Sequence, residues 1–499
     1  MRAAALFRAA LLLLAATAAS PAAAQPVVTS AAPQRVALTV YRAPGGSGAI
    51  NLRFLGGFAL VTETRRVALP RGAAVLRFEG VAEGIVPVSA VVDGLPGGVV
   101  EKNRDARLLS PASLVDGSLG RQVTLTRTNR ATGRKTSEDA TIVAGPTPGV
   151  VLRTATGIET LRCSGLPEGL SYGGVPAGLS SKPVLSIATV SPVARTVTVR
   201  LSYLASDFDW RASYVATLAA DQRSLDLFAW LTLANGNAEI FPNAEVAAVA
   251  GRLNRIYTPS LRAAVGALSL TCYPLGTTTS NLRKREFEPA EEIIVTGSRV
   301  MAAPAFGPPP PPPPPPEDLG DLKLYRVPER VTVAARGQKQ VALLARSAVP
   351  FERRYRRQLY PRQTMPLSPT VAVLVLRNRA ESGLGLALPS GSTATYARRG
   401  DERLLLGLGA LDDRAEGETF RLSAGTSTQI LVGQTQLSQN ETLITATNAS
   451  RLPARLEVPI GDAGQKIESD DPALERIDGI ATWSILLEPN SRAELRIRY

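Results

Sequence analysis

Residues 195–214 read RTVTVRLSYLASDFDWRASY, and this stretch decides the fold. Every second residue from Val197 to Tyr203 is apolar, while the residues between them are Thr, Arg and Ser. That period of two is typical of a β-strand with one buried face. Because the stretch also carries the aromatic residues Trp210 and Tyr214, we expect it to form the centre of a β-sheet core.

The residues that follow extend the same pattern. Asp207-Phe208-Asp209 predicts a turn, and Leu225–Leu233 predicts a second strand with its leucines on one face. Asn235-Gly236 is typical of a tight hairpin, so we expect the second strand to end there. In this strand context Trp210 and Trp230 are predicted to be core anchors rather than sugar-stacking platforms.

Short apolar runs separated by Gly, Pro and Asp continue along the chain, and helical signals are scarce. The best helical candidate is one turn within Ser110–Leu119. The predicted strands are Val36–Tyr41, Phe58–Leu69, Ala73–Phe78, Val123–Arg127, Val150–Thr154, Asp321–Tyr325, Lys339–Arg346, Thr370–Leu376, Glu441–Asn448, Ala454–Pro459 and the alternating C-terminus from Ala493. The fold class predicted is all-β, with antiparallel β-sandwich domains in tandem and a long disordered Pro-rich insertion.

The chain layout follows from shifts in composition. We expect an N-terminal β domain at 26–191, a central β-sandwich region at 192–347 and a C-terminal β domain at 348–499. The central region contains the insertion, residues 276–318, which includes an unbroken proline run from Pro308 to Pro316. Such a run favours a solvated polyproline II conformation and forms no packed core.

The first 24 residues are typical of a cleaved bacterial secretory signal. They combine Arg2 and Arg8 with an apolar run at Leu11–Leu14 and end on alanines before Gln25. Beyond them no apolar stretch reaches about 18 residues, so we expect no transmembrane segment after cleavage. The predicted location is periplasmic or secreted.

The formal net charge of +13 favours anionic partners, and export would decide which anions the chain meets. We expect no nucleic acid there, and an anionic envelope polysaccharide is the more available counter-charge. Phe351–Leu359 places Arg353 and Arg357 on one face of a strand and Arg354 and Arg356 on the other. A solvated sheet edge that resists aggregation is the favoured interpretation, and a strip that binds anionic polysaccharide is the alternative.

Composition argues against catalysis and cofactors. The chain has no histidine, which removes the usual general base and the commonest metal ligand. Cys163 and Cys272 have no partners at zinc-ligand spacing; they could form one disulfide in an oxidising compartment or remain two free thiols. Asp207 and Asp209 could form a paired-carboxylate site, but we favour a structural turn role, and the same holds for Asp412-Asp413 and Asp470-Asp471. No catalytic, metal-binding or cofactor-binding residue is predicted.

Several short sequences together resemble an exported bacterial family known only as domain of unknown function 4139. They are LSYL (201–204), WRASY (210–214), WLTL (230–233), FPNA (241–244), VAG (249–251) and NR (254–255), with further likenesses at 63–65, 78–81, 108–111, 126–129, 325–328, 350–355, 383–389 and 482–483. The resemblance covers most of the mature chain. It implies a β-rich fold without an established activity, and relatives named for an effect on mucoid colony appearance.

One further motif, Glu291–Arg299, reads EEIIVTGSR. It resembles the segment near the mature N-terminus of TonB-dependent outer-membrane receptors, which the energy-transducing protein captures by strand addition. The β-branched run Ile293, Ile294, Val295 and Thr296, with Gly297 after it, could offer its backbone donors and acceptors to an exposed sheet edge. These five residues are therefore the candidate contact with a periplasmic or outer-membrane protein, and pairing with the chain's own sheet is the alternative.

Two classes of function remain open on the sequence. The favoured one is an exported, non-enzymatic β-sandwich protein of unknown molecular activity that acts as an envelope interaction or scaffold protein. The alternative is a carboxylate-dependent hydrolase or a carbohydrate-binding protein that acts on envelope polysaccharide.

Overall fold

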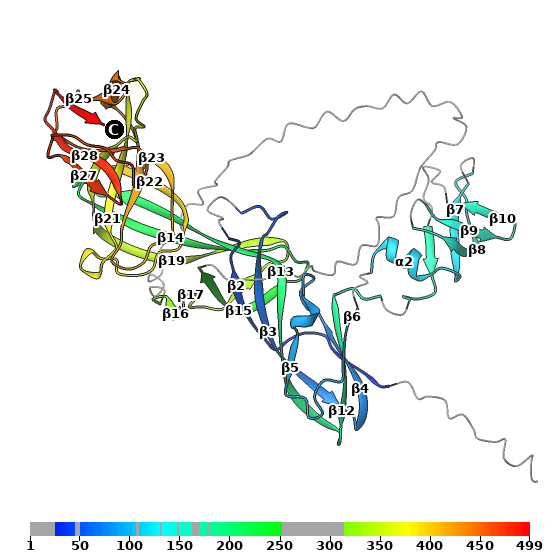
Figure 1. Ribbon diagram of the computed structural model, residues 1–499. Coiled ribbons are helices and arrows are strands. Elements are labelled where there is room, and N and C mark those ends of the chain that lie inside the picture. Colours follow the sequence, from blue (N-terminus) through cyan, green and yellow to red (C-terminus); the bar gives the residue numbers. More distant parts are fainter. Residues whose placement is uncertain are drawn as a thin grey trace, which may run out of the picture.

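A computed structural model describes residues 25–44, 50–105, 109–129, 132–146, 149–161, 169–176, 179–251 and 314–499. The all-β fold class is confirmed, because the described chain forms four β-sheets and one short α-helix. Figure 1 shows the sheet formed by the C-terminal strands at one end of the molecule, a small sheet beside helix α2 at the other, and the largest sheet between them.

The largest sheet has 12 strands and takes them from both halves of the chain. They are β2 (Arg35–Tyr41), β3 (Gly57–Leu69), β5 (Val91–Asp93), β13 (Arg195–Leu218), β14 (Ser224–Asn235), β15 (Phe241–Ala250), β16 (Glu317–Leu319), β17 (Leu322–Arg326), β18 (Val331–Val333), β19 (Gly337–Pro350), β22 (Gly391–Arg399) and β23 (Glu402–Leu411). Strands from all three of the expected regions, 26–191, 192–347 and 348–499, therefore share one sheet.

The other sheets are smaller. The four-stranded sheet contains β1 (Val27–Ser30), β4 (Gly72–Glu79), β6 (Glu101–Asp105) and β12 (Val184–Ser191), and the five-stranded sheet contains β7 (Gln122–Thr128), β8 (Lys135–Ala144), β9 (Val151–Thr154), β10 (Gly157–Thr160) and β11 (Gly169–Tyr172). The eight-stranded sheet contains β20 (Glu352–Arg356), β21 (Met365–Arg377), β24 (Thr419–Ser438), β25 (Glu441–Asn448), β26 (Ala454–Ile460), β27 (Leu474–Ile477), β28 (Ile480–Leu487) and β29 (Ser491–Arg498).

Helical structure is confined to three short elements in the described chain. The expected helical turn is α2 (Pro111–Gly117), and Ser110 caps it because its Oγ accepts the Ser113 N–H at 3.0 Å while the Ser113 side chain accepts the Ser110 N–H. Two 3₁₀ turns lie at Pro87–Ser89 and Ala380–Ser382. None of these helices is long and apolar enough to cross a membrane.

The centre of the largest sheet is β13, a single strand of 24 residues. The turn expected at 207–209 is wrong, because the strand continues through it with a β-bulge between Ser206 and Phe208. Asp207 is the bulged residue and has a φ of 62°. The bulge divides the strand into a first part that pairs with β3 and a second part that pairs with β14 on one side and β22 on the other.

The hairpin expected at Asn235-Gly236 is also wrong. Strand β14 pairs with β13 and β19, whereas β15 pairs with β2, β17 and β18. The Asn235 side chain is buried, and its amide donates to the carbonyls of Glu239 and Ala334 at 2.8 and 3.1 Å. Asn235 therefore joins two loops instead of turning the chain back on β14.

Three separate cores hold these sheets together. The largest core lies between the 12-stranded and four-stranded sheets and receives Leu374, Leu376, Phe420 and Leu422 from the eight-stranded sheet. A second core is centred on Trp483 in the eight-stranded sheet, and a third belongs to the five-stranded sheet. Burial of the apolar side chains in these cores is the dominant favourable contribution to folding.

Candidate functional site

A junction forms where the described chain stops at Gly251 and resumes at Pro314. Strands β15 and β17, which stand on either side of this gap, pair antiparallel from Ala250 with Lys323 to Ala247 with Arg326. Strand β16 adds to the outer edge of β17. The strands that flank residues 252–313 are thus β15 and β16, which belong to one sheet with β17 between them.

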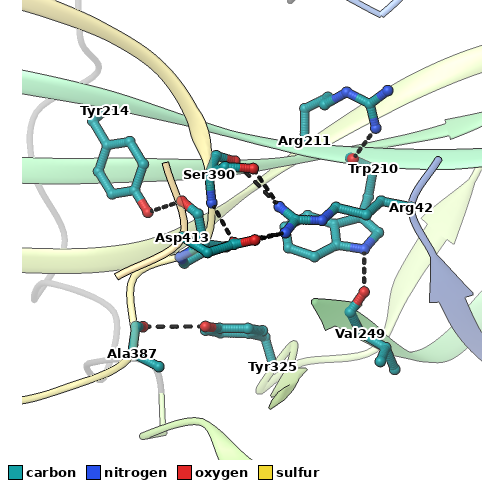
Figure 2. Close-up of polar contacts among 10 residues, drawn as sticks. Arg42, Trp210, Arg211, Tyr214, Val249, Tyr325, Ala387, Ser390 and Asp413 are labelled. Atoms are coloured by element: carbon teal, nitrogen blue, oxygen red, sulfur yellow. Dashed lines mark hydrogen bonds and ion pairs between the residues drawn. The ribbon is translucent and has the colours of Figure 1, made fainter. Parts of the chain in front are cut away.

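Trp210 on β13 packs against this junction and contacts both β15 and β17. Its side chain is 0 % exposed, and its indole N–H donates to the carbonyl of Val249 near the end of β15 at 3.0 Å. The ring of Tyr325 on β17 lies 6.0 Å from the Trp210 ring (Figure 2). The expectation that Trp210 is a core anchor is confirmed, and its polar edge secures β15 as well.

Arg42, which follows β2, joins the junction to a distant hairpin. Its guanidinium lies 5.5 Å from the centre of the Trp210 ring, within the range of a cation–π contact. The same group donates to Ser390 Oγ at 2.7 Å and to both carboxylate oxygens of Asp413 at 2.6 and 2.5 Å (Figure 2). The Ser390 N–H also donates to Asp413 at 2.8 Å, so both ends of the β22–β23 hairpin are tied to β2.

Two tyrosines complete the contacts to residues 386–389. The Tyr214 hydroxyl donates to the carbonyl of Pro389 at 2.6 Å, and the Tyr325 hydroxyl donates to that of Ala387 at 3.1 Å (Figure 2). Burial raises the pKa of both phenols well above the ordinary value, and the negative charge of Asp413 raises it further. At neutral pH both tyrosines are protonated donors and not bases.

The free space at the junction is small. One cavity of about 20 Å³ lies between Tyr214, Tyr325, residues 386–389 and Pro314–Pro316. Another of about 20 Å³ borders Tyr41 and Phe58, whose rings stack at 4.6 Å. Each has room for roughly one water molecule. The described residues of the junction are therefore closely packed against one another.

The carboxylates considered for catalysis have structural contacts here. Asp209 is buried, and its Oδ1 accepts from Arg211 at 2.6 Å and from the N–H groups of Ala43 and Trp210 at 3.0 and 2.8 Å. The carbonyl of the bulged Asp207 accepts the Gly236 N–H at 2.8 Å. These contacts stabilise the bulge and the strand that contain Asp207 and Asp209, and not the turn that the sequence predicted.

Several other predicted residues lie elsewhere. Trp230 is 38 % exposed and packs edge-on against Phe228, so its predicted place in the core is wrong. Asp413 belongs to the junction, whereas Asp470 pairs with Arg498 in the eight-stranded sheet. Cys163, Cys272 and the motif Ile293–Gly297 lie outside the described residues. Within the described part of the chain, no group of three or more acidic, Cys or His residues could hold a metal ion.

The arginine strand at Phe351–Leu359 is not a sheet edge. Strand β20 lies between β26 and β21, so the interpretation as a solvated edge is wrong. Arg353 contacts Gln222 at 2.8 Å, and Arg357 donates to the carbonyl of Pro369 at 2.7 Å. Arg354 and Arg356 contact a buried glutamate, Glu457, on the neighbouring strand.

Sequence reasoning missed Arg42, Ser390 and Asp413 as parts of one site. Arg42 and Asp413 are 371 residues apart, and each stands among loop residues of ordinary composition. The sequence holds one weak indication of this site, because residues 383–389 and 210–214 both belong to the short sequences that resemble the exported bacterial family. Nothing in their composition indicates that the two segments touch.

Comparison with models of known protein families and with curated proteins found no match for this chain. The resemblance to the exported bacterial family therefore stays a prediction.

Proposed function

We propose that this chain is an exported, non-enzymatic envelope interaction protein that presents residues 252–313 to a partner from a fixed base. The observation that carries the proposal is the strand order β16-β17-β15, because it anchors the strands before and after that segment in one sheet, one strand apart.

The side-chain contacts of the junction suit a scaffold. Trp210 links β13 to β15, and Arg42 links β2 to Asp413 beyond β23. The carboxylates of Asp209 and Asp413 are both engaged by arginine, and the two buried tyrosines donate to backbone carbonyls. These contacts give each group a positioning role, which favours the non-enzymatic function over a carboxylate-dependent hydrolase.

The proposed partner is a periplasmic protein with an exposed sheet edge, and the proposed contact is Glu291–Arg299. Strand addition depends on backbone hydrogen bonds, so a proline at Val295 would remove one donor and disfavour pairing. Val295→Thr is the matched control because it retains a β-branched residue and the backbone N–H.

The experiment measures binding of the full chain to the C-terminal domain of TonB by isothermal titration calorimetry. We expect saturable binding by the natural chain and by Val295→Thr, and at least a ten-fold loss for Val295→Pro and for a chain without residues 276–313. Equal affinity of all four proteins, or no binding by the natural chain, would contradict the proposed contact.

One observation favours the second candidate, a carbohydrate-binding protein. Trp230 presents a partly exposed ring beside Phe228 on β14, and Gln340 donates to Thr232 at 3.1 Å on the neighbouring strand. An exposed aromatic ring with amide and hydroxyl groups nearby is suited to stack on a sugar. Loss of retention on immobilised envelope polysaccharide in Trp230→Ala, with Phe54→Ala as an exposed aromatic control, would support this candidate.

A further inference from the structure

Four arginines gather on one face of the eight-stranded sheet. Arg354 and Arg356 point to the same side of β20 because they are two residues apart. Arg356 stands opposite Glu457 of β26. Arg421 of β24 stands opposite Val375 of β21, which is also opposite Glu352. The register therefore brings charged side chains of β20, β24 and β26 together on one face. Arg455 joins them because it stands two residues before Glu457 on β26 and so points to the same side.

Glu457 is the centre of this group and is almost completely buried, with a side chain 2 % exposed. Its Oε1 lies 2.8 Å from Arg354 Nη1 and 3.5 Å from Arg421 Nη2, and its Oε2 lies 4.0 Å from Arg356 Nε. Three guanidinium groups are thus drawn to one carboxylate. Since a carboxylate has a single negative charge, it cannot neutralise all three.

Other acids reduce the excess charge but do not remove it. Glu352 lies 2.7 Å from Arg354 and 3.1 Å from Arg455, and Asp478 acts on Arg356 through its charge. Four guanidinium groups therefore face three carboxylates among the described residues of this group. We call the arginines and acids of this group the arginine face.

Arg356 and Arg421 have unused donors. Neither donates a hydrogen bond to any residue in the described part of the chain, although their side chains are only 37 % and 27 % exposed. Burial and the nearby charge of Arg421 lower the pKa of Arg356. Two partly desolvated arginines that repel each other and have donors without a hydrogen-bond partner are favourable positions for a bound anion.

Packing alone accounts for only part of this arrangement. Arg354 stands opposite Val373 and Arg421 opposite Val375, and both valines are buried, so the arginine stems are placed to cover them. Stems could cover these valines with the guanidinium groups directed to separate acids or to water. Their convergence compensates the buried charge of Glu457, and the group still holds one more guanidinium than carboxylate.

We propose that the arginine face binds a phosphate-type oxyanion through Arg356 and Arg421, with Glu457 and Glu352 holding Arg354 in place beside them. The planar guanidinium group matches two oxygens of a phosphate, and two such groups bind one anion with geometric specificity. The site does not depend on the partner proposed for residues 252–313. Free phosphate and a phosphate group on a lipid share the chemistry recognised here.

The first test titrates the full chain with inorganic phosphate at constant ionic strength by calorimetry. We expect saturable binding that Arg356→Gln and Arg421→Gln each weaken at least ten-fold. Arg353→Gln, which removes the same charge from the opposite face of the same strand, should change the affinity by less than two-fold. Arg356→Lys should lie between the natural chain and Arg356→Gln, because it keeps the charge without the planar fork.

Absence of saturable phosphate binding, or an equal loss in Arg353→Gln, would overturn the proposal. Circular dichroism and the urea midpoint of each variant show that the fold is retained. A second arm uses phosphatidylcholine vesicles with and without phosphatidic acid. Tighter binding to the phosphatidic acid vesicles than to inorganic phosphate, lost in Arg356→Gln, identifies a lipid source; equal affinities identify the free ion.

Discussion

The guanidinium of Arg42 and the carboxylate of Asp413 form a two-oxygen ion pair across 371 residues of chain. Asp413 is 56 % exposed, so solvent screens much of the attraction. We expect Asp413→Asn to lower the free energy of unfolding by about 1 kcal/mol or less. Arg42→Ala should cost more, about 2 kcal/mol, because it also uncovers the Trp210 ring.

Urea unfolding followed by tryptophan fluorescence measures both changes. Asp412→Asn is the neighbouring control, since the Asp412 side chain is 88 % exposed. Its effect should remain within about 0.5 kcal/mol. If Asp412→Asn and Asp413→Asn had equal effects, the contact with Arg42 would contribute nothing specific.

Trp210 and Trp230 should respond very differently to truncation. Trp210→Ala removes a fully buried ring and leaves the carbonyl of Val249 without its donor, so we expect a loss of about 3–5 kcal/mol. Trp230→Ala removes a partly exposed ring and should cost about 1 kcal/mol or less. Chemical denaturation gives both values, and similar losses in the two variants would be inconsistent with the structure.

Alkaline pH should destabilise the folded chain through its buried tyrosines. Burial raises the pKa of Tyr214 above the ordinary value of 10.0, so the unfolded chain releases this proton first. The stabilisation is therefore complete below about pH 10 and is lost as the pH rises above it, by up to about 1.4 kcal/mol per pH unit for one group. Tyr214→Phe should make the unfolding free energy fall less steeply between about pH 9.5 and 11.

The comparison for this slope is Tyr360→Phe, which changes a tyrosine that is 46 % exposed. It removes the same hydroxyl group from an exposed side chain and so controls for the substitution itself. A Tyr214→Phe slope identical to that of the natural chain would mean that the phenol ionises as readily in the folded protein as in the unfolded one.

The bulge at Asp207 makes a prediction about backbone conformation. Its φ of 62° is readily adopted by glycine and strained for a β-branched residue. We expect Asp207→Gly to lower the unfolding free energy by about 1 kcal/mol or less, because it removes the hydrogen bond that the Asp207 carboxylate accepts from Ser206, and Asp207→Val to lower it by about 1–3 kcal/mol. Thermal unfolding provides the measurement, and the opposite order would show that the Asp207 side chain matters more than its backbone.

Local periodicity predicted the strands well, because alternation along β13 or β3 is a property of adjacent residues. Residues 207–209 and 235–236 misled because Asp and Asn are compatible both with turns and with bulges or buried amide contacts, and only the neighbouring strands decide between them. Trp230 misled for a related reason: its neighbours Ala229 and Leu231 point into the core, whereas the Trp230 ring lies on the other face of the strand, where it is partly exposed.

The candidate sites depended on pairings that the sequence does not contain. Composition identified the arginines of β20. Their contact with Glu457, which lies 103 residues after Arg354, requires the parallel register of β20 with β26. The junction requires β2, β13, β15 and β22 to meet, and no motif specifies that order. The sequence shows which chemical groups are present, whereas the strand pairing decides which of them lie close together.

The parallel pairings of β15 with β2 and of β13 with β22 also constrain how the molecule comes into being. The edge of β13 that receives Gly391–Arg399 stays open until those residues have been made, long after β13 itself. Contacts between such distant segments slow folding. The largest sheet is therefore completed only after most of the chain has been made, and until then the unpaired edge of β13 is open to any other strand.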